Sequence, residues 1–125
     1  MSKANKASAP QVEQAPGFEG RYSDLGGYVV GFESYTADQD AAPLFRGLPD
    51  DACQCPHWGV VTRGRITFRF TDGTTEDYVG GDAYYARPGH TPAVTAGTEV
   101  VEFSPADDLA KTMTVVMANL KAIQD

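Results

Sequence analysis

Short runs of alternating apolar and polar residues, separated by turn signals, fill the middle of this 125-residue chain. Ile66, Phe68 and Phe70 alternate with Thr67 and Arg69, which is the period of two expected for a half-buried strand. The Asp-Gly pair that follows them is a hairpin signal. Further strands are predicted over residues 26–35, 52–62, 75–79, 83–86, 90–95 and 99–103, with the last two paired around residues 96–97. Many short strands with regular turns predict an all-β barrel or sandwich.

The two ends of the chain differ in composition from the middle. Residues 1–17 are rich in Ala, Ser, Lys, Gln and Pro and predict a disordered tail. Ser104 and Pro105 form a predicted helix start, with serine as the N-cap and proline at the first helical position. Apolar residues then recur at helical spacing, at Leu109, Met113, Val116 and Leu120. We therefore expect one domain with a tail over 1–17, a barrel over 18–104, and an amphipathic helix over 105–122 packed on the barrel or on a partner subunit.

The net charge of −7 argues against nucleic-acid binding, which depends on Lys and Arg contacts to phosphate. Arg63, Arg65 and Arg69 lie close together, but no aromatic side chains alternate with them on their face, so a solvated outer surface is predicted. No apolar run approaches the ~20 residues of a membrane-spanning helix, and no apolar segment follows the lysines near the N-terminus. A cytoplasmic protein without membrane contact is expected.

Both cysteines and both histidines of the chain fall in two short segments. Cys53, Cys55 and His57 are two residues apart, so on a regular strand their side chains would all point to the same face. With His90 they would form a tetrahedral metal site, for which two thiolates and two imidazoles favour Zn(II), with Fe or Cu as alternatives. Cysteines this close make a strained disulfide. Two readings without a metal stay open: inert packing of two buried cysteines, and a thiol redox pair.

The spacing around Cys53 and His57 resembles a known sequence motif. A motif with metal ligands at positions i, i+2 and i+6 and a glycine seven residues after the last ligand, here Gly64, places its ligands at Asp51, Cys53 and His57. A second motif, with a Gly-Asp turn, a short strand, a proline–glycine turn and a histidine, matches residues 81–90. Both motifs resemble those of the cupin superfamily, with Cys and His in place of the usual His and Glu.

The resemblance covers residues 25–104 and implies a double-stranded β-helix, the jelly-roll barrel of the cupins. The family's second-motif histidine would fall at position 92, which is Pro92 here, and His90 lies two residues earlier with the same facing. A small single-domain cupin with a divalent metal at Cys53, Cys55, His57 and His90 is therefore expected.

The predicted function is that of a metal-binding cupin, with zinc as the favoured metal, acting on or sensing a small organic molecule inside the barrel. Thiolates beside a redox metal and dioxygen are prone to oxidation, which favours a lyase, isomerase or hydrolase step over a dioxygenase step. Asp51 is a candidate further ligand or general base, and equally a plain loop residue. The alternative is a non-enzymatic barrel that binds a ligand or a protein, with a structural metal or none.

The aromatic residues and the helix carry the remaining expectations. One of Tyr84 and Tyr85 should face into the barrel, and Trp58 should lie outside or at an interface. Phe68, Phe70 and Val94 are expected to fill the barrel. The apolar helix offers a surface for a homodimer.

Overall fold

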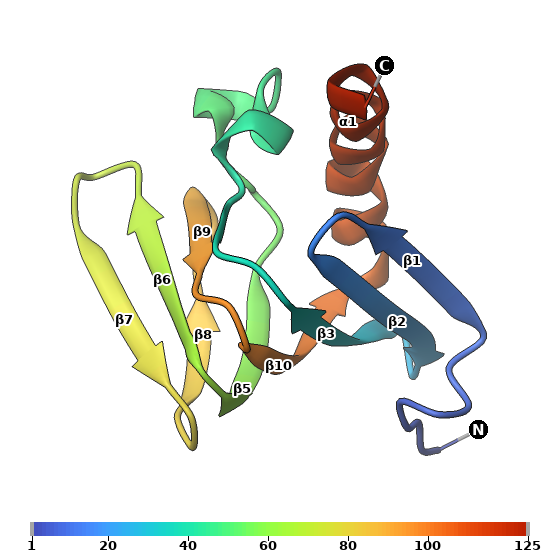
Figure 1. Cartoon of the computed structure of the whole chain (residues 1–125). Coiled ribbons are helices and arrows are strands. Elements are labelled where there is room, and N and C mark those ends of the chain that lie inside the picture. The colour runs from blue at the N-terminus through green and yellow to red at the C-terminus, as the bar shows by residue number, and fades with distance from the viewer. Residues whose placement is uncertain (1, 125) are drawn as a thin grey trace.

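Most of residues 2–124, which the computed structural model describes, fold into two antiparallel β-sheets (Figure 1). Within these residues the strands are β1 (Gln11–Ala15), β2 (Phe18–Leu25), β3 (Tyr28–Tyr35), β4 (Gln39–Asp40), β5 (His57–Arg63), β6 (Arg65–Phe70), β7 (Thr75–Val79), β8 (Ala83–Ala86), β9 (His90–Val94) and β10 (Glu99–Pro105). The larger sheet has the order β1-β2-β3-β10-β5-β8, and the smaller has the order β4-β9-β6-β7. Two 3-10 helices, η1 (Ala42–Phe45) and η2 (Pro49–Asp51), and the helix α1 (Ala106–Gln124) complete the chain. The predicted all-β class with one C-terminal helix is confirmed.

The core lies between the inner faces of the two sheets. Strand β6 alternates between buried and half-buried positions as its sequence predicts, and it pairs with β7 across the predicted hairpin. The buried cluster contains Val61, Ile66, Phe68, Phe70, Tyr84, Ala86, Val94 and Val100. Tyr84 is therefore the inward tyrosine, whereas Tyr85 is exposed on the opposite face and contacts Trp58 there, with ring centroids 5.2 Å apart.

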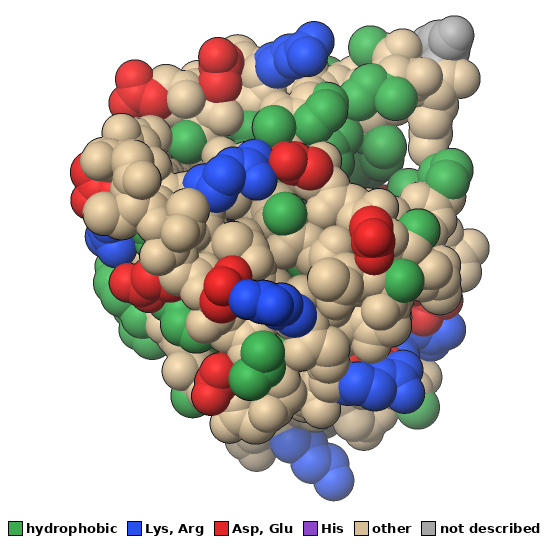
Figure 2. Space-filling model, turned by 60° about the vertical axis from the view of Figure 1, so that its left-hand side comes forward, with side chains coloured by type: hydrophobic (Ala, Val, Ile, Leu, Met, Phe, Trp, Pro, Cys, Tyr) green, Lys and Arg blue, Asp and Glu red, His purple; other side chains and the backbone are tan. Residues whose placement is uncertain are grey.

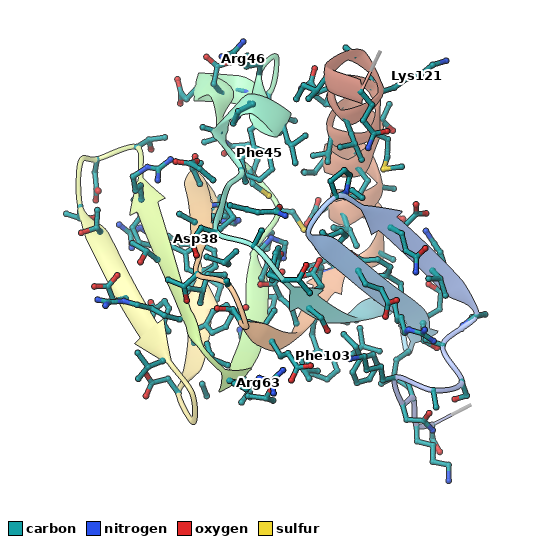
Figure 3. The ribbon with its side chains drawn as sticks, viewed as in Figure 1. Asp38, Phe45, Arg46, Arg63, Phe103 and Lys121 are labelled. Atoms are coloured by element: carbon teal, nitrogen blue, oxygen red, sulfur yellow. The ribbon has the colours of Figure 1, made fainter. Side chains whose placement is uncertain are left out.

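A second apolar cluster joins α1 to the loop that carries η1. Phe45, Cys53, Cys55 and Val116 are buried together, and Figure 3 shows Phe45 below the η1 loop, beside α1. Asn119 fastens the helix to the loop, because its side-chain amide donates to the carbonyls of Leu44 and Arg46, each at 2.8 Å. The apolar stripe of α1 thus packs on its own chain. No helix within residues 2–124 combines the length and the apolar character needed to cross a membrane.

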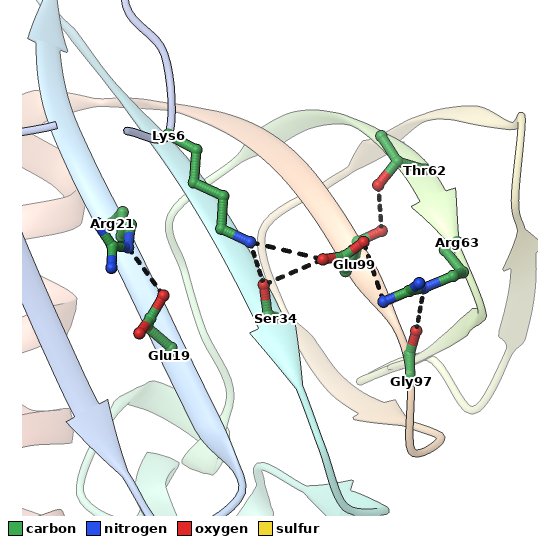
Figure 4. Close-up of polar contacts among 8 residues, drawn as sticks. All are labelled: Lys6, Glu19, Arg21, Ser34, Thr62, Arg63, Gly97 and Glu99. Atoms are coloured by element: carbon green, nitrogen blue, oxygen red, sulfur yellow. Dashed lines mark hydrogen bonds and ion pairs between the residues drawn. The ribbon is translucent and has the colours of Figure 1, made fainter. Parts of the chain in front are cut away.

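The N-terminal segment is more ordered than its composition predicts. Strand β1 pairs with β2 along its whole length, and Lys6 donates to Ser34 at 3.1 Å and pairs with Glu99 at 3.5 Å on the outer face of the larger sheet (Figure 4). The expectation of a disordered tail over 1–17 is wrong for Gln11–Ala15, and Met1 lies outside the described residues. Backbone pairing to an open sheet edge needs few apolar side chains, so composition alone underestimates such a strand.

One strand pairing and one helix boundary near the C-terminus also differ from the prediction. The segments around residues 96–97 do not form a hairpin, because β9 pairs with β4 and β6 whereas β10 pairs with β3 and β5. Ser104 and Pro105 belong to β10, and the helix begins at Ala106. Ser104 faces the interior as a buried residue and therefore does not cap the helix.

Candidate metal centre

Three of the four predicted ligands meet at one point in the interior. Cys53 lies opposite His90 in an isolated antiparallel bridge, in which the Cys53 amide donates to the His90 carbonyl at 2.9 Å. His57 begins β5, and β5 alternates inward and outward positions from that residue onward. The Cys53 sulfur and one ring nitrogen of each histidine all lie within 4.8 Å of one another, and all three residues are buried. We call Cys53, His57 and His90 the ligand triad.

The second ring nitrogen of each histidine has its own partner. Nδ1 of His90 lies 2.7 Å from the carbonyl oxygen of Arg87, so it carries the proton and donates it. Nδ1 of His57 lies 2.7 Å from the Ser104 hydroxyl and 3.4 Å from a carboxylate oxygen of Glu102. Such partners orient both rings, and in His90 the protonated Nδ1 leaves the lone pair of Nε2 available, as is usual for metal-binding histidines. Nε2 of His90 is buried without any hydrogen-bond partner among the described residues.

The spacing of the ligand triad fits a metal. Sγ of Cys53 lies 3.6 Å from Nε2 of His57. Two ligands on one tetrahedral zinc ion, with bonds of about 2.3 Å to sulfur and about 2.0 Å to nitrogen, would be about 3.5 Å apart. The same distance allows a weak hydrogen bond between the thiol and the imidazole. That hydrogen bond leaves Nε2 of His90 without a partner, whereas a metal bound by the ligand triad would satisfy it.

Burial sets the protonation of the ligand triad. It lowers the pKa of His57 to about 4, and burial together with the neighbouring His57 lowers the pKa of His90 to about 4. Both imidazoles are therefore neutral at pH 7, the form that binds metals. Burial raises the pKa of the Cys53 thiol to about 11, so this group holds its proton until a cation displaces it.

A cavity of about 460 Å³ adjoins the ligand triad. All three triad residues line it, and the opposite wall comes from α1, through Leu109, Met113 and Val116 among others. Strand β1 and the C-terminal turns of α1 also contribute lining residues. In Figure 2 hydrophobic side chains gather in a hollow at the upper right, near the C-terminal end of the chain, and no histidine is visible on that face. The volume is in the range of small-molecule pockets.

Two tyrosine–glutamate pairs on the larger sheet also reach this cavity. The hydroxyl of Tyr22 donates to Glu33 at 2.7 Å, and the hydroxyl of Tyr84 donates to Glu102. Each ring lies over a glycine on the neighbouring strand: a Cβ at Gly31 would come within 2.8 Å of Tyr22, and one at Gly59 within 2.5 Å of Tyr84. The glycines therefore make room for the rings that direct the hydroxyls onto the carboxylates.

The two carboxylates influence each other. Burial raises the pKa of Glu33, and the charge of Glu102 raises it further; burial also raises the pKa of Glu102. The sequence analysis missed both residues. A weak signal was present for Glu102, because it shares the inward parity of Val100 in a strand that is otherwise largely apolar. Nothing in the sequence brings Glu33 and Glu102 together before β3 and β10 are known to pair.

The comparisons with known proteins identify the fold of the chain. Neither a family model nor a curated protein sequence matches this chain. Among solved structures, an RmlC-like cupin from Shewanella frigidimarina matches with a TM-score of 0.55 and 15% identity, over 82% of this chain and 88% of that one. The polyketide cyclase RemF from Streptomyces resistomycificus matches with a TM-score of 0.57 and 15% identity, over 84% and 79% of the two chains. The iron(II) form of HppE matches with a TM-score of 0.56 and 11% identity, over 83% and 59%. The chain has a cupin fold.

Two predicted site residues of this cupin-fold chain, Cys55 and Asp51, are not among the three residues whose ligand atoms converge. Cys55 is buried. The chain bends at Cys55, and the regular strand begins only at His57, so the alternation assumed for Cys53, Cys55 and His57 is interrupted. Its sulfur lies 3.5 Å from the Pro56 carbonyl oxygen.

Asp51 lies outside the cavity. Its side chain is exposed and accepts a hydrogen bond from the Gly47 amide at 3.0 Å, and it is not one of the lining residues. The reading of Asp51 as a loop residue fits this geometry better than a role as ligand or general base.

Proposed function

We propose that this cupin holds a divalent metal, zinc in the first place, at Cys53, His57 and His90, and transforms a small organic molecule in the adjoining cavity. The observation that carries the proposal is the convergence of three buried ligand atoms within 4.8 Å, one of them the unpartnered Nε2 of His90. Fe(II) and copper are the alternatives for the metal, since imidazole suits both. The iron(II) form of HppE is a protein of the same fold.

The proposed site is of the open kind. Three protein ligands on zinc are typical of catalytic centres, in which the fourth position is left for water or substrate. A divalent metal there would supply a Lewis acid at the wall of the cavity. Glu102 contacts His57 and lines the same cavity, and burial raises the pKa of this carboxyl toward neutrality. Such a group suits general acid–base catalysis, so we assign proton transfer to Glu102.

A lyase, isomerase or hydrolase step fits this set of groups better than oxygen insertion. The reason lies with Cys53, because a thiolate bound to a redox metal would be oxidised in the presence of dioxygen. A thiol redox pair of Cys53 and Cys55 is disfavoured, since burial raises the pKa of Cys53 to about 11 and that of Cys55 to about 12, and reactive thiols need a lowered pKa.

Elemental analysis of the purified and zinc-reconstituted protein tests the metal. We expect about one zinc per chain, lost in Cys53→Ala and in His90→Ala, and retained in Cys55→Ala as the matched control. Zinc content unchanged by Cys53→Ala, or no zinc bound even after reconstitution, would contradict the proposal.

A non-enzymatic barrel is the second candidate. Its support is the apolar cluster in which Cys53 and Cys55 pack with Phe45 and Val116 to hold α1 on the barrel. If the metal serves only that packing, its removal should lower the melting temperature strongly.

A homodimer in the cytoplasm is part of the proposal in either case. The exposed Tyr28, Trp58 and Tyr85 on the outer face of the larger sheet favour association, and sedimentation as a monomer at micromolar concentration would exclude it.

A further inference from the structure

We infer that the cavity takes an apolar molecule carrying a protonated amine, and that Glu33 and Glu102 bind the ammonium group. The inference names the substrate class for the cavity of the proposed function. It rests on that proposal for the cavity as a binding site, and it does not require the metal.

The charge of the cavity selects the ligand. Glu33 and Glu102 come from the adjacent strands β3 and β10 and both line the cavity. No Lys or Arg is among the lining residues, and none forms an ion pair with either glutamate within residues 2–124. In that part of the chain the one ion-pair partner found for Glu102 is the His57 imidazole, whose Nδ1 lies 3.4 Å from the carboxylate.

The carboxylates have hydrogen-bonding capacity left for a ligand. An ionised carboxylate accepts about four hydrogen bonds, and each of these receives one from a tyrosine hydroxyl, Tyr22 for Glu33 and Tyr84 for Glu102. A buried carboxylate without a cation is unfavourable. An ammonium group between the two would supply up to three donors and a compensating charge.

A second feature, shared with the proposed metal site, marks the cavity as a place for a ligand. His90 is 1% exposed and lines the cavity, yet its Nε2 has no hydrogen-bond partner among the described residues. The rest of the cavity lining indicates which apolar group the amine should carry. Leu109, Met113 and Leu120 from α1 and Phe68 from β6 present apolar surface, which favours an aromatic or aliphatic group.

Three probes of nearly equal size separate these possibilities: 2-phenylethylamine, 2-phenylethanol and phenylacetate. Calorimetric titration of the full-length protein near neutral pH should show the amine binding at least about tenfold more tightly than the alcohol, with phenylacetate the weakest. Equal affinities for the amine and the alcohol, or tighter binding of phenylacetate, would overturn the inference.

A variant that removes the charge of Glu33 tests whether this carboxylate causes the preference for the amine over the alcohol. Glu33→Gln keeps an acceptor for Tyr22 but removes the charge, so it should weaken binding of the amine about tenfold or more and leave the alcohol nearly unchanged. Glu76→Gln is the matched control, because Glu76 also accepts from a tyrosine, Tyr78, but is exposed and outside the cavity. An unchanged preference for the amine in Glu33→Gln would remove Glu33 from the site. If that variant does not fold, the three probes on the wild-type protein still decide.

The metal is tested separately in the same experiment. Cys53→Ser should lose zinc and keep the preference for the amine over the alcohol. A preference that disappears with the zinc would show that the amine binds the metal, which overturns the inference and leaves the proposed metal site standing. A protein that never binds zinc but still prefers the amine would contradict the proposed metal site and support the inference.

Discussion

Ser104 is the residue that orients His57 toward the centre of the ligand triad. Its hydroxyl lies 2.7 Å from Nδ1 of His57, and both residues are buried. Partners of this kind hold the imidazole in the orientation and tautomer that a metal requires, and their loss typically weakens metal binding by about 10- to 100-fold. Ser104 therefore belongs to the site although it cannot itself reach the metal position.

We predict that Ser104→Ala weakens zinc binding about tenfold while the protein stays folded. Glu102, at 3.4 Å from the same nitrogen, retains part of the orientation, which places the effect near the lower end of the range. Competition with a zinc-binding dye measures the affinity. Ser34→Ala is the control, since Ser34 on the neighbouring strand β3 bonds Lys6 and Glu99 on the outer face (Figure 4). The same loss in both variants would deny Ser104 this role.

At the scale of single residues, strand parity predicted side-chain facing only where the strand is regular. It correctly placed Phe68 and Phe70 inside and Trp58 outside. It left Tyr84 and Tyr85 undecided, because both are aromatic and only the pairing of β8 with β5 shows which one lies over Gly59. It failed for Cys55, where the bend before His57 interrupts the alternation.

The strands β5 and β8 are held in register by a contact that glycine permits. Gly59 pairs with Tyr84, and the tyrosine ring covers the space where a side chain would stand. This packing directs the Tyr84 hydroxyl to Glu102, so the element that shapes the barrel also positions a carboxylate of the cavity.

We predict that Gly59→Ala destabilises the protein by about 1–3 kcal/mol, the usual cost of overpacking a well-filled interior. An added Cβ would come within 2.5 Å of the Tyr84 ring, and the ring could escape only by leaving Glu102. Denaturant unfolding measures the change. Gly80→Ala is the control, because its nearest neighbour would be an ordinary 3.6 Å away, and it should cost far less. An equally small effect at both positions would show that the ring moves freely.

At the scale of elements, local signals were predicted and long-range pairings were not. The β6–β7 hairpin follows from its Asp-Gly turn. The turn near Gly97 also was visible, but it joins strands of different sheets, and the sequence does not distinguish a turn within a sheet from a turn between sheets. Strand β1 was missed because its polar residues gain stability from backbone pairing with β2 rather than from apolar burial.

For the molecule as a whole, the cavity is a product of topology. The two sheets bring residues of β3, β5, β6, β9 and β10 to one interior, and α1 covers it from the side. The ligand triad could be predicted because its members cluster in two short segments. The carboxylates of Glu33 and Glu102 could not, since each stands alone in its segment and becomes part of a site only when β3 and β10 pair.

The proton balance of metal binding tests the composition of the site. At pH 7 both imidazoles are already neutral, because burial lowers the pKa of His57 and of His90 to about 4, whereas Cys53, with a pKa raised to about 11, still holds its proton. Binding zinc should therefore release one proton from Cys53, in addition to any proton lost by a water in the open fourth position. The affinity should rise about tenfold for each pH unit between about 6 and 9, since the thiolate is the scarce form throughout that range.

Calorimetric titration of zinc in buffers of different ionisation enthalpy counts that proton directly. A second coordinating thiol would add a second proton, because burial raises the pKa of Cys55 to about 12. A proton count that is unchanged in Cys55→Ser is the result expected for a centre of one cysteine and two histidines with an open position toward the cavity. A count that falls by one proton in Cys55→Ser would mean that Cys55 coordinates the zinc and that the chain bend at Cys55 straightens on metal binding. The centre would then be closed by four protein ligands and would have a structural role.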